Sequence, residues 1–364
     1  MPNLIQFSNN DIVNDTQKVA VSTWTNNQNN LTTVFTSSIQ ADVSSATSSG
    51  AFILDVYNSE TGSAGSEVQF SIAYGHRAGS SSLNFTNDVG GKGRSSSGVT
   101  YAQYRNLVFG DNTISDFKFN DHTPDDIWII NINRARYKHN LKTSTLNLYL
   151  SGSGVEDSGP TINNPGLYGQ VHLTDDSITT TGSSTITNVG RQFNIVSGAN
   201  GEQSGSNLTQ IVDAQTGDSI GSYGLFYPDA GFIILNGDAV SQSIGLSASR
   251  ADHVEPEYNK LFNAIRNGNG GLVSYFIVDS EEKISSQFYF VRARNGEFNY
   301  TTNPSYIDDS GNLNFVSMID NPKTFITTVG LYNNNGDLVA VAKISQPIAK
   351  DFTKEALIRV KLDY

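Results

Sequence analysis

Short runs of alternating apolar residues, each ended by glycine, asparagine or serine, recur along this chain and restrict how it can fold. The clearest example is FITTVGLYNNNGDLVAVAKISQPI at 325–348, where two such runs flank an Asn/Gly turn. Side chains that alternate with a period of two occupy opposite faces of a β-strand, and Asn-Gly favours a hairpin turn. The sequence therefore predicts a two-strand ribbon, followed by a third strand that runs almost to Tyr364.

The composition also favours β-structure. Only 16% of the 364 residues are charged, against about 25% in an average globular protein, and Ser, Thr, Asn and Gly fill the gap. These four residues disfavour helix interiors. Hydrophobic residues make up 37%, which is enough to bury cores, and the length allows two or three domains. We expect a mainly β protein with two or more antiparallel β-sandwich or barrel-like domains and a few short helices.

Further strands are predicted in both halves of the chain. The runs 51–57 and 67–74 flank a Gly/Ser turn, which indicates a hairpin. Strand patterns also occur in DDIWIININRARYKHNL (125–141), STLNLYLSGSG (144–154), FNIVSGANG (193–201) and SYGLFYPDAGFIILNG (222–237), and LVSYFIVDSEEKISSQFYFVRARNGEFNY (272–300) predicts a second hairpin.

Two segments have helical spacing instead. VTYAQYRNLVFG at 99–110 predicts a short helix closed by Gly110. A second helix is predicted near 254–267, because apolar residues there recur at i, i+3, i+4 and i+7. Its apolar positions are Tyr258, Leu261, Phe262 and Ile265, its expected capping pair is Asp252 and Glu255, and its expected end is Gly268.

Polar and glycine-rich stretches suggest where domains meet. Residues 1–50 are polar and predict an N-terminal arm or small β segment. A β domain is expected over 51–155, and a C-terminal β domain with one helix over 156–364. The candidate linker between them is GSGVEDSGPTINNPG at 152–166. Long loops at 78–100 and 151–167 could wrap neighbouring proteins.

Charge and cysteine content exclude several classes of function. The net charge of −12 disfavours binding to phosphate backbones, so no nucleic-acid partner is expected. The chain has no cysteine, which excludes disulfides and thiolate metal sites. No apolar run approaches the ~18 residues of a membrane span, and the N-terminus shows no secretory signal. A soluble protein made in a cytoplasm is the simplest interpretation.

No catalytic, cofactor or metal site is predicted. HTPDD at 122–126 offers a histidine and two aspartates, but Pro and Asp favour a turn before the following strand. IDDSGN at 307–312 lacks the final glutamate of a calcium loop, so a β-turn is expected. Lys92 and Arg94 lie among glycines without the spacing of a phosphate loop. Asp125 and Asp126 are neighbours on a strand and point to opposite faces, which makes a poor acid–base pair.

Two Arg-Ala-Arg sequences are the candidate interface residues. Each follows an apolar strand, where side chains two positions apart share a face. Arg and Tyr are favoured anchors of protein interfaces. A solvated strand end or an ion pair within the chain is an equally good interpretation, and charge reversal at the first pair would test the interface. The candidate residues are Arg134, Arg136 and Tyr137, and Arg292 and Arg294.

Several phrases together resemble a known family. They run in order from about residue 50 to 364 and include VQFSIAYGHRAGS, YAQYRNLVFGDN, DDIWIININRARYKHNL, YGLFYPDAGFIILNG and the whole C-terminal stretch FITTVGLYNNNGDLVAVAKISQPIAKDFTKEALIRVKLDY. They are similar to virion structural proteins of the tail or baseplate in large contractile-tailed, marine cyanophage-like myoviruses. The first 50 residues share no such likeness.

The resemblance implies a non-enzymatic structural component of the virion tail, in the baseplate, made in the cytoplasm of a bacterial host. Its partners would be copies of itself and other tail or baseplate proteins. Three alternatives stay open: a tail-fibre or receptor-binding adhesin, a neck or capsid-surface protein, and a tail-borne enzyme that degrades glycans. The adhesin would carry an exposed aromatic site, and the enzyme would need paired carboxylates in a cleft.

Overall fold

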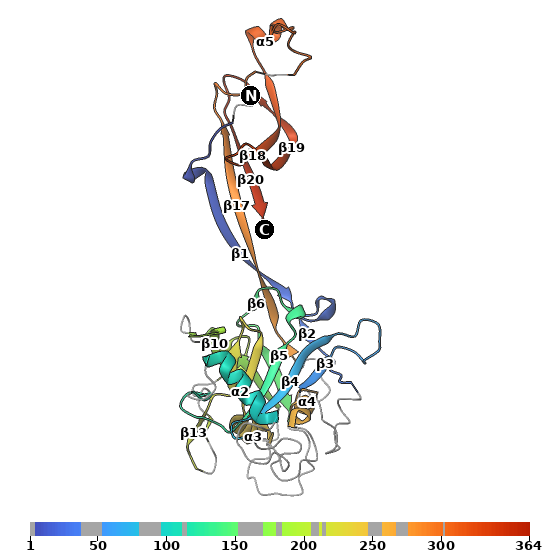
Figure 1. Cartoon of the computed structure of the whole chain (residues 1–364), viewed down its shortest axis with the longest axis vertical. Helices are drawn as coiled ribbons and strands as arrows, with labels where there is room; N and C mark the ends of the chain where they lie inside the picture. Colours follow the sequence, from blue (N-terminus) through green and yellow to red (C-terminus); the bar gives the residue numbers. More distant parts are fainter. Residues whose placement is uncertain are drawn as a thin grey trace. The chain divides into compact units, whose positions relative to one another are not determined.

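The computed structural model describes residues 4–37, 53–79, 96–110, 115–151, 170–179, 184–204, 211–212, 216–246, 257–266, 276–300 and 303–364. The chain forms two compact units. Unit 1 comprises residues 1–18 and 283–364, and unit 2 comprises residues 19–282. The chain therefore crosses between the units twice, within strand β1 (Ile12–Ser22) and within strand β17 (Asp279–Ala293) (Figure 1).

This division differs from the one expected from the sequence. The expected boundaries after residues 50 and 155 both fall inside unit 2. Strands β7 (Asn147–Ser151) and β8 (Gln170–Asp175) lie on either side of the candidate linker, and they pair directly with each other. The segment between them therefore connects neighbouring strands of one sheet. Residues 38–52, the whole predicted linker at 152–166, and Lys92 and Arg94 lie outside the described residues.

Unit 2 contains most of the described β-structure, and the prediction of a mainly antiparallel β fold is confirmed, with one sheet curled into a half-barrel. Its largest sheet has twelve described strands, with β9 and β11 pairing with β10 beside the main path. Along that path the strands are β2 (Asn30–Leu31), β16 (Phe276–Ile277), β7, β8, β10 (Gly190–Ala199), β14 (Gly224–Tyr227), β15 (Phe232–Asn236), β5 (Asp126–Ile132), β4 (Val68–His76) and β3 (Ile53–Tyr57).

Unit 2 also contains smaller elements, of which β9 and β11 extend this sheet, β6 pairs with β17, and β12 pairs with β13. They are the 3₁₀ turns η2 (Thr25–Asn27) and η4 (Arg134–Arg136) and the short strands β6 (Asn140–Leu141), β9 (Thr185–Thr187), β11 (Glu202–Gln203), β12 (Ile211–Val212) and β13 (Ser219–Gly221).

The sheet of unit 2 is buried on both faces at its centre. In β5, Ile127 and Ile129 join one hydrophobic cluster, whereas Trp128, Ile130 and Ile132 join another. Helix α2 (Ser96–Phe109) contributes to the first cluster, and helices α3 (Gly237–Ile244) and α4 (Glu257–Arg266) contribute to the second. The sheet thus lies between α2 and the pair α3 and α4, as the ribbon in Figure 1 shows.

A glycine in β4 sets how closely α2 approaches the sheet. A Cβ atom at Gly75 would lie 3.1 Å from the backbone nitrogen of Tyr101 in α2. The Tyr101 ring is buried and meets Phe117 edge-on, with the ring centroids 5.5 Å apart. Burial raises the pKa of Tyr101 to about 12, so its hydroxyl stays protonated.

Unit 1 consists of a separate hairpin and a sheet of three strands, and a fourth strand, β6 of unit 2, pairs with Ser280 and Glu281 at the start of β17. The sheet has the order β1–β17–β20, where β20 is Ala356–Asp363. The hairpin pairs β18 (Thr324–Tyr332) with β19 (Leu338–Lys350). Its inner side places Val329, Leu331, Ala340 and Ala342 in one cluster with residues of β17 and β20. The remaining elements are the 3₁₀ turn η1 (Asn9–Asp11) and helix α5 (Val316–Asp320).

Most local predictions are confirmed. The ribbon at 325–348, the third strand, the hairpin β3–β4 and the turn at 307–312 are present. Helix α2 begins at Ser96, three residues before its predicted start, so residues 96–100 are not a loop. Helix α4 buries all four of its predicted apolar residues, while Asp252, Glu255 and Gly268 lie outside the described residues.

Two local predictions are wrong. The expected hairpin at 272–300 is instead one strand of 15 residues, β17, which pairs with β1, β6 and β20. Ser285 and Ser286 do not form a turn, because Ser285 exchanges backbone hydrogen bonds with Tyr364 and Ser286 pairs with Asp363 in β20, so the strand continues. The first Arg-Ala-Arg sequence does not lie on a strand, because β5 ends at Ile132 and Arg134–Arg136 form the 3₁₀ turn η4. Asn133 caps this turn by accepting a hydrogen bond from the backbone nitrogen of Ala135.

A buried ammonium group holds the end of the hairpin in unit 1. Lys350 is 0% exposed, and its Nζ donates to three oxygens. They are the carbonyl of Asn295 at 2.9 Å, Oδ1 of Asn299 at 2.9 Å and the carbonyl of Asp351 at 3.1 Å. An ammonium has three protons to donate, so this set satisfies it fully. The contacts connect the end of β19 to the loop that follows β17.

Replacing Lys350 by methionine should destabilise unit 1. Oδ1 of Asn299 and the carbonyl of Asp351 would lose this donor at buried positions, at an expected cost of about 2–4 kcal/mol, whereas the carbonyl of Asn295 would keep its hydrogen bond from Nδ2 of Asn299 at 2.6 Å. Urea denaturation followed by far-UV circular dichroism measures the loss, and the fluorescence of Trp24 and Trp128 follows unit 2 separately. Lys323→Met, at an exposed position, is the matched control. Equal unfolding curves for the two variants would show that the hydrogen bonds of Lys350 do not stabilise unit 1.

A buried carboxylate in unit 2 gives the fold a pH dependence. Asp175 is fully buried, and its two oxygens accept the backbone N–H of Ser144 at 2.7 and 3.1 Å. Burial raises the pKa of Asp175 despite this hydrogen bond. A raised carboxyl pKa favours folding fully below the unfolded value of about 4, and this contribution is lost as the pH rises through the folded value.

Asp175→Asn should remove that dependence, because an amide keeps an acceptor oxygen and carries no charge. As the pH rises from about 4 to neutrality, the variant should gain stability relative to the unaltered protein. Urea midpoints from tryptophan fluorescence across this range measure the difference. Asp218→Asn, at an exposed site, controls for loss of one charge. Parallel pH curves for Asp175→Asn and the unaltered protein would show that Asp175 does not contribute.

Candidate assembly surface

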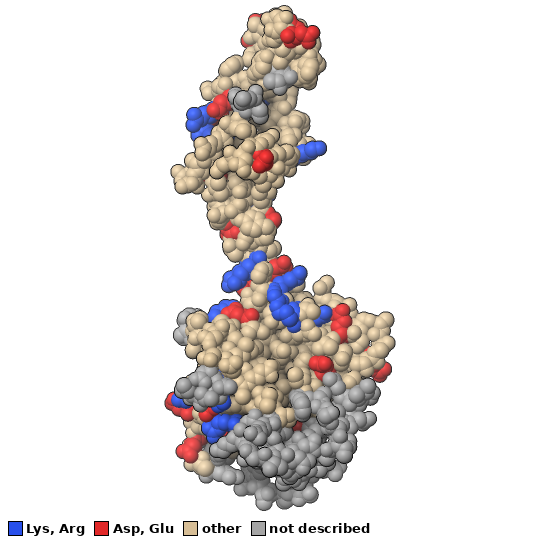
Figure 2. Space-filling view, in the orientation of Figure 1, with Lys and Arg blue, Asp and Glu red and all other residues tan. Residues whose placement is uncertain are grey.

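Unit 1 exposes far more apolar surface than its size predicts. It is the smaller unit, yet it carries most of the large hydrophobic side chains that are exposed among the described residues. Figure 2 shows that its visible face carries few charged atoms. The exposed residues are Leu4, Ile5, Val13, Phe298, Tyr300, Tyr306, Phe315, Val316, Ile319, Phe325, Tyr332, Leu338, Val339, Val341, Phe352, Leu357 and Tyr364. Where exposed apolar side chains lie together, the patch they form often marks an interaction site.

The first exposed area is the outer face of the hairpin. Val329 and Leu331 point inward, so the alternate positions of β18 and their partners in β19 point outward. Gly330 lies opposite Val341, and Tyr332 lies opposite Leu338. A Cβ at Gly330 would lie 3.0 Å from the Tyr332 ring and 3.1 Å from Leu338, so these side chains lie over the glycine. We name Tyr332, Leu338, Val339 and Val341 the hairpin patch.

The second area is the outer face of the sheet. Tyr289 pairs with Val360 and Val291 pairs with Ile358, and these four side chains face the hairpin. The alternate positions form the opposite face and combine aromatic, aliphatic and basic side chains. We name them the sheet patch: Phe288, Phe290, Arg292, Leu357, Arg359 and Lys361.

Cations surround an aromatic ring in the sheet patch. The guanidinium carbon of Arg359 lies 5.3 Å from the centroid of Phe288, and Nζ of Lys361 lies 5.9 Å from it. Such cation–π contacts keep basic groups beside an apolar ring. Arg292 donates to Glu355 at 2.7 Å, and this bond lowers the pKa of Glu355. Nζ of Lys361 lies 2.9 Å from Oδ1 of Asp363, so two of the three cations of the sheet patch are paired within the chain, and Arg359 adds positive charge beside the aromatic ring.

Open strand edges adjoin both areas. Within the described residues, β20 pairs only with β17, and β18 and β19 pair only with each other. A strand edge presents backbone N–H and C=O groups that another strand can use. Unit 1 thus offers polar edges as well as apolar faces to a neighbour.

The candidate residues of the first Arg-Ala-Arg sequence have partners inside unit 2. Arg134 lies 4.6 Å from the Tyr137 ring centroid and donates to the Tyr137 carbonyl. Arg136 donates to Glu67 at 2.6 Å and to the Thr25 hydroxyl at 2.5 Å. The Thr25 hydroxyl and Arg136 lower the pKa of Glu67. Tyr137 is buried, and its hydroxyl donates to the carbonyl of Ala230 at 3.0 Å.

The second pair is more open. Arg292 belongs to the sheet patch, whereas Arg294 follows the end of β17 and its backbone nitrogen donates to Glu297 at 2.9 Å. The interface role of these five residues stays a prediction. The sequence did not single out the hairpin patch or the remaining residues of the sheet patch. A signal was present in LVAVA at 338–342, where large and small apolar residues alternate.

The side chains of HTPDD are held by separate partners. Nε2 of His122 lies 2.7 Å from Oδ2 of Asp238, Asp125 pairs with Arg77 at 2.6 Å, and Asp126 accepts the hydroxyl of Tyr74 at 2.5 Å. Within the described ranges, no group of three or more His, Cys, Asp or Glu side chains could hold a metal ion. No described helix has both the length and the apolar character needed to cross a bilayer.

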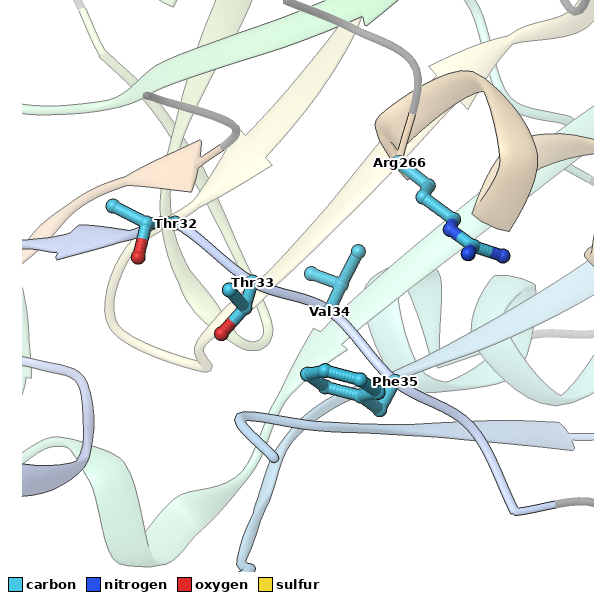
Figure 3. Close-up of a pocket in the computed structure, with 5 residues that line it drawn as sticks. All are labelled: Thr32, Thr33, Val34, Phe35 and Arg266. Atoms are coloured by element: carbon cyan, nitrogen blue, oxygen red, sulfur yellow. The ribbon is translucent and has the colours of Figure 1, made fainter. Parts of the chain in front are cut away.

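A small pocket of about 170 Å³ lies in unit 2. Figure 3 shows its lining, in which residues 32–35 form one extended segment and Arg266 extends from the end of α4. The lining contains two hydroxyls, two apolar side chains and one guanidinium, namely Thr32, Thr33, Val34, Phe35 and Arg266. It lacks a paired acid and base, so it supports no catalytic assignment.

No protein-family model matches the chain, and no curated protein or solved structure is significantly similar to it. The likeness to phage tail proteins therefore stays a prediction from the sequence.

Charge reversal at Arg136 should destabilise unit 2, because Arg136→Glu would place a carboxylate beside Glu67. We expect a lower urea midpoint in tryptophan fluorescence, and the second change Glu67→Lys should restore much of it by reversing the pair. Arg294→Glu, in unit 1, is the matched control. An unchanged midpoint for Arg136→Glu would show that the ion pair contributes nothing to stability.

Proposed function

We propose that this protein is a non-enzymatic structural component of a contractile-tailed bacteriophage virion, located in the tail baseplate. The observation that carries the proposal is the surface of unit 1, with its two exposed apolar areas and its open strand edges. Such a surface is a hazard for an isolated protein, and burial in an assembly removes the hazard. The position in the baseplate rests on the sequence resemblance.

Two kinds of partner suit the two patches. The sheet patch joins Arg292, Arg359 and Lys361 to aromatic rings, and Arg and aromatic residues are enriched in protein interfaces. Its positive charge suits an acidic neighbour among other tail proteins. The hairpin patch lacks charge and suits an apolar neighbour. These contacts would form after synthesis in the bacterial cytoplasm.

A receptor-binding adhesin is the second candidate, because aromatic side chains also gather around α5. Tyr306 and Phe315 are 39% and 48% exposed, and their ring centroids lie 5.1 Å apart. Phe298 and Tyr300, which precede this region, are exposed as well. Exposed aromatic rings are a common means of holding apolar faces of ligands.

Immunogold electron microscopy of the phage that encodes this chain separates the candidates. Antibody label at the distal end of the tail is expected. Label along the fibres would favour the adhesin, and label at the neck or capsid would contradict the baseplate position. Mass spectrometry of purified particles is the control for epitope access. Absence of the chain from those particles would refute a structural role in the virion.

A further inference from the structure

The hairpin patch has the features of a surface that binds a copy of itself. Its four side chains are 42% to 67% exposed, and they surround the flat position at Gly330. Together they expose roughly a few hundred Å² of apolar surface, which is the range of functional patches on monomers. Homodimer interfaces are more apolar than the remaining surface of a protein.

We infer that the hairpin patch of one copy binds the hairpin patch of a second copy across a two-fold axis. The inference deepens the proposed function and rests on it for its setting, since it names one of the contacts by which the subunits assemble. A two-fold contact uses the same surface on both subunits, so the surface must be complementary to itself.

The charges around the patch meet this requirement. The middle of the outer face, from Leu338 to Val341, carries no charged residue. Asp337 lies at the turn end of β19, and Lys343 lies further along the strand, opposite Thr328. An axis near Ala340 relates two antiparallel copies of β19. This axis therefore brings Asp337 of one copy toward Lys343 of the other copy. The two side chains carry opposite charges and attract each other.

The sheet patch cannot bind itself in the same way. A two-fold contact there would bring basic side chains toward one another, and it would also desolvate the ion pairs of Arg292 with Glu355 and of Lys361 with Asp363, both of which are unfavourable. The two patches therefore differ in the partner they accept. A second copy fits the hairpin patch, and a protein of opposite charge fits the sheet patch.

The small core of unit 1 favours this contact. Among the described residues, its hydrophobic cluster has three buried members, Val329, Leu331 and Val360, and the rest are partly buried. Small domains bury a low fraction of their surface and often gain stability from oligomerisation. In the dimer, the hairpin of each copy would lie between the sheet of its own unit 1 and the hairpin of the second copy.

The test is the oligomeric state of the full chain, measured by analytical ultracentrifugation over a range of concentrations. The unaltered protein should form dimers. Val341→Glu should raise the dissociation constant at least about 100-fold, because it places two like charges near the axis. Leu357→Glu makes the same kind of change at a similarly exposed position of the sheet patch, and it should leave the dimer intact. Circular dichroism and melting curves establish that both variants are folded.

A charge exchange tests the register of the contact without changing apolar residues. Asp337→Lys alone and Lys343→Asp alone should each weaken the dimer, and the double variant should restore it. Additive weakening in the double variant would refute the two-fold arrangement. An unaltered protein that is monomeric at all soluble concentrations would refute self-association, as would a dimer that survives Val341→Glu or dissociates with Leu357→Glu.

These outcomes are separate from those of the virion experiment. A monomer that labels the tail would overturn this inference and leave the proposed function standing. A dimer that is absent from purified particles would support this contact and refute the virion role.

Discussion

Strands β5 and β15 bury side chains on both faces, and unit 2 must therefore cover its sheet twice. Helix α2 covers one face, and helices α3 and α4 lie on the other. In unit 1 the hairpin covers one face of the sheet, and the outer faces of both layers keep apolar side chains exposed. Apolar faces are stabilised when another surface covers them. This difference in cover is the physical reason for placing assembly on unit 1.

Local structure could be predicted where the pattern leaves one solution. The alternation at 325–348 specifies two strands, and the spacing of Tyr258, Leu261 and Ile265 specifies a helix face. Long-range pairing could not be predicted. In β17 the residues from Phe288 to Val291 are all apolar, so the pattern does not choose an inner face. In β19 the larger residues face outward, since Ala340 and Ala342 occupy the limited space beside β17.

The contacts of the candidate interface residues could not be predicted from the sequence either. Residue type singled out Arg and Tyr as groups that often anchor interfaces, but it could not show which contacts they make in this chain. Arg136 pairs with Glu67, which is 69 positions away in the sequence and directly precedes β4. Arg292 lies beside Glu355 at one margin of the sheet patch. Burial and pairing of such groups depend on the whole fold, because the partners converge only after the sheet has formed.

The sequence of unit 2 is inserted within that of unit 1. During synthesis, residues 19–282 leave the ribosome before residues 283–364 and can fold as a unit, as domains generally do. Residues 1–18 have to wait, because the strands with which they pair follow residue 282. Both patches lie within residues 283–364, so they form only after unit 2 has been synthesised. Under the proposed function, a copy that lacks these residues would keep unit 2 and lose the two patches through which the subunits bind their neighbours.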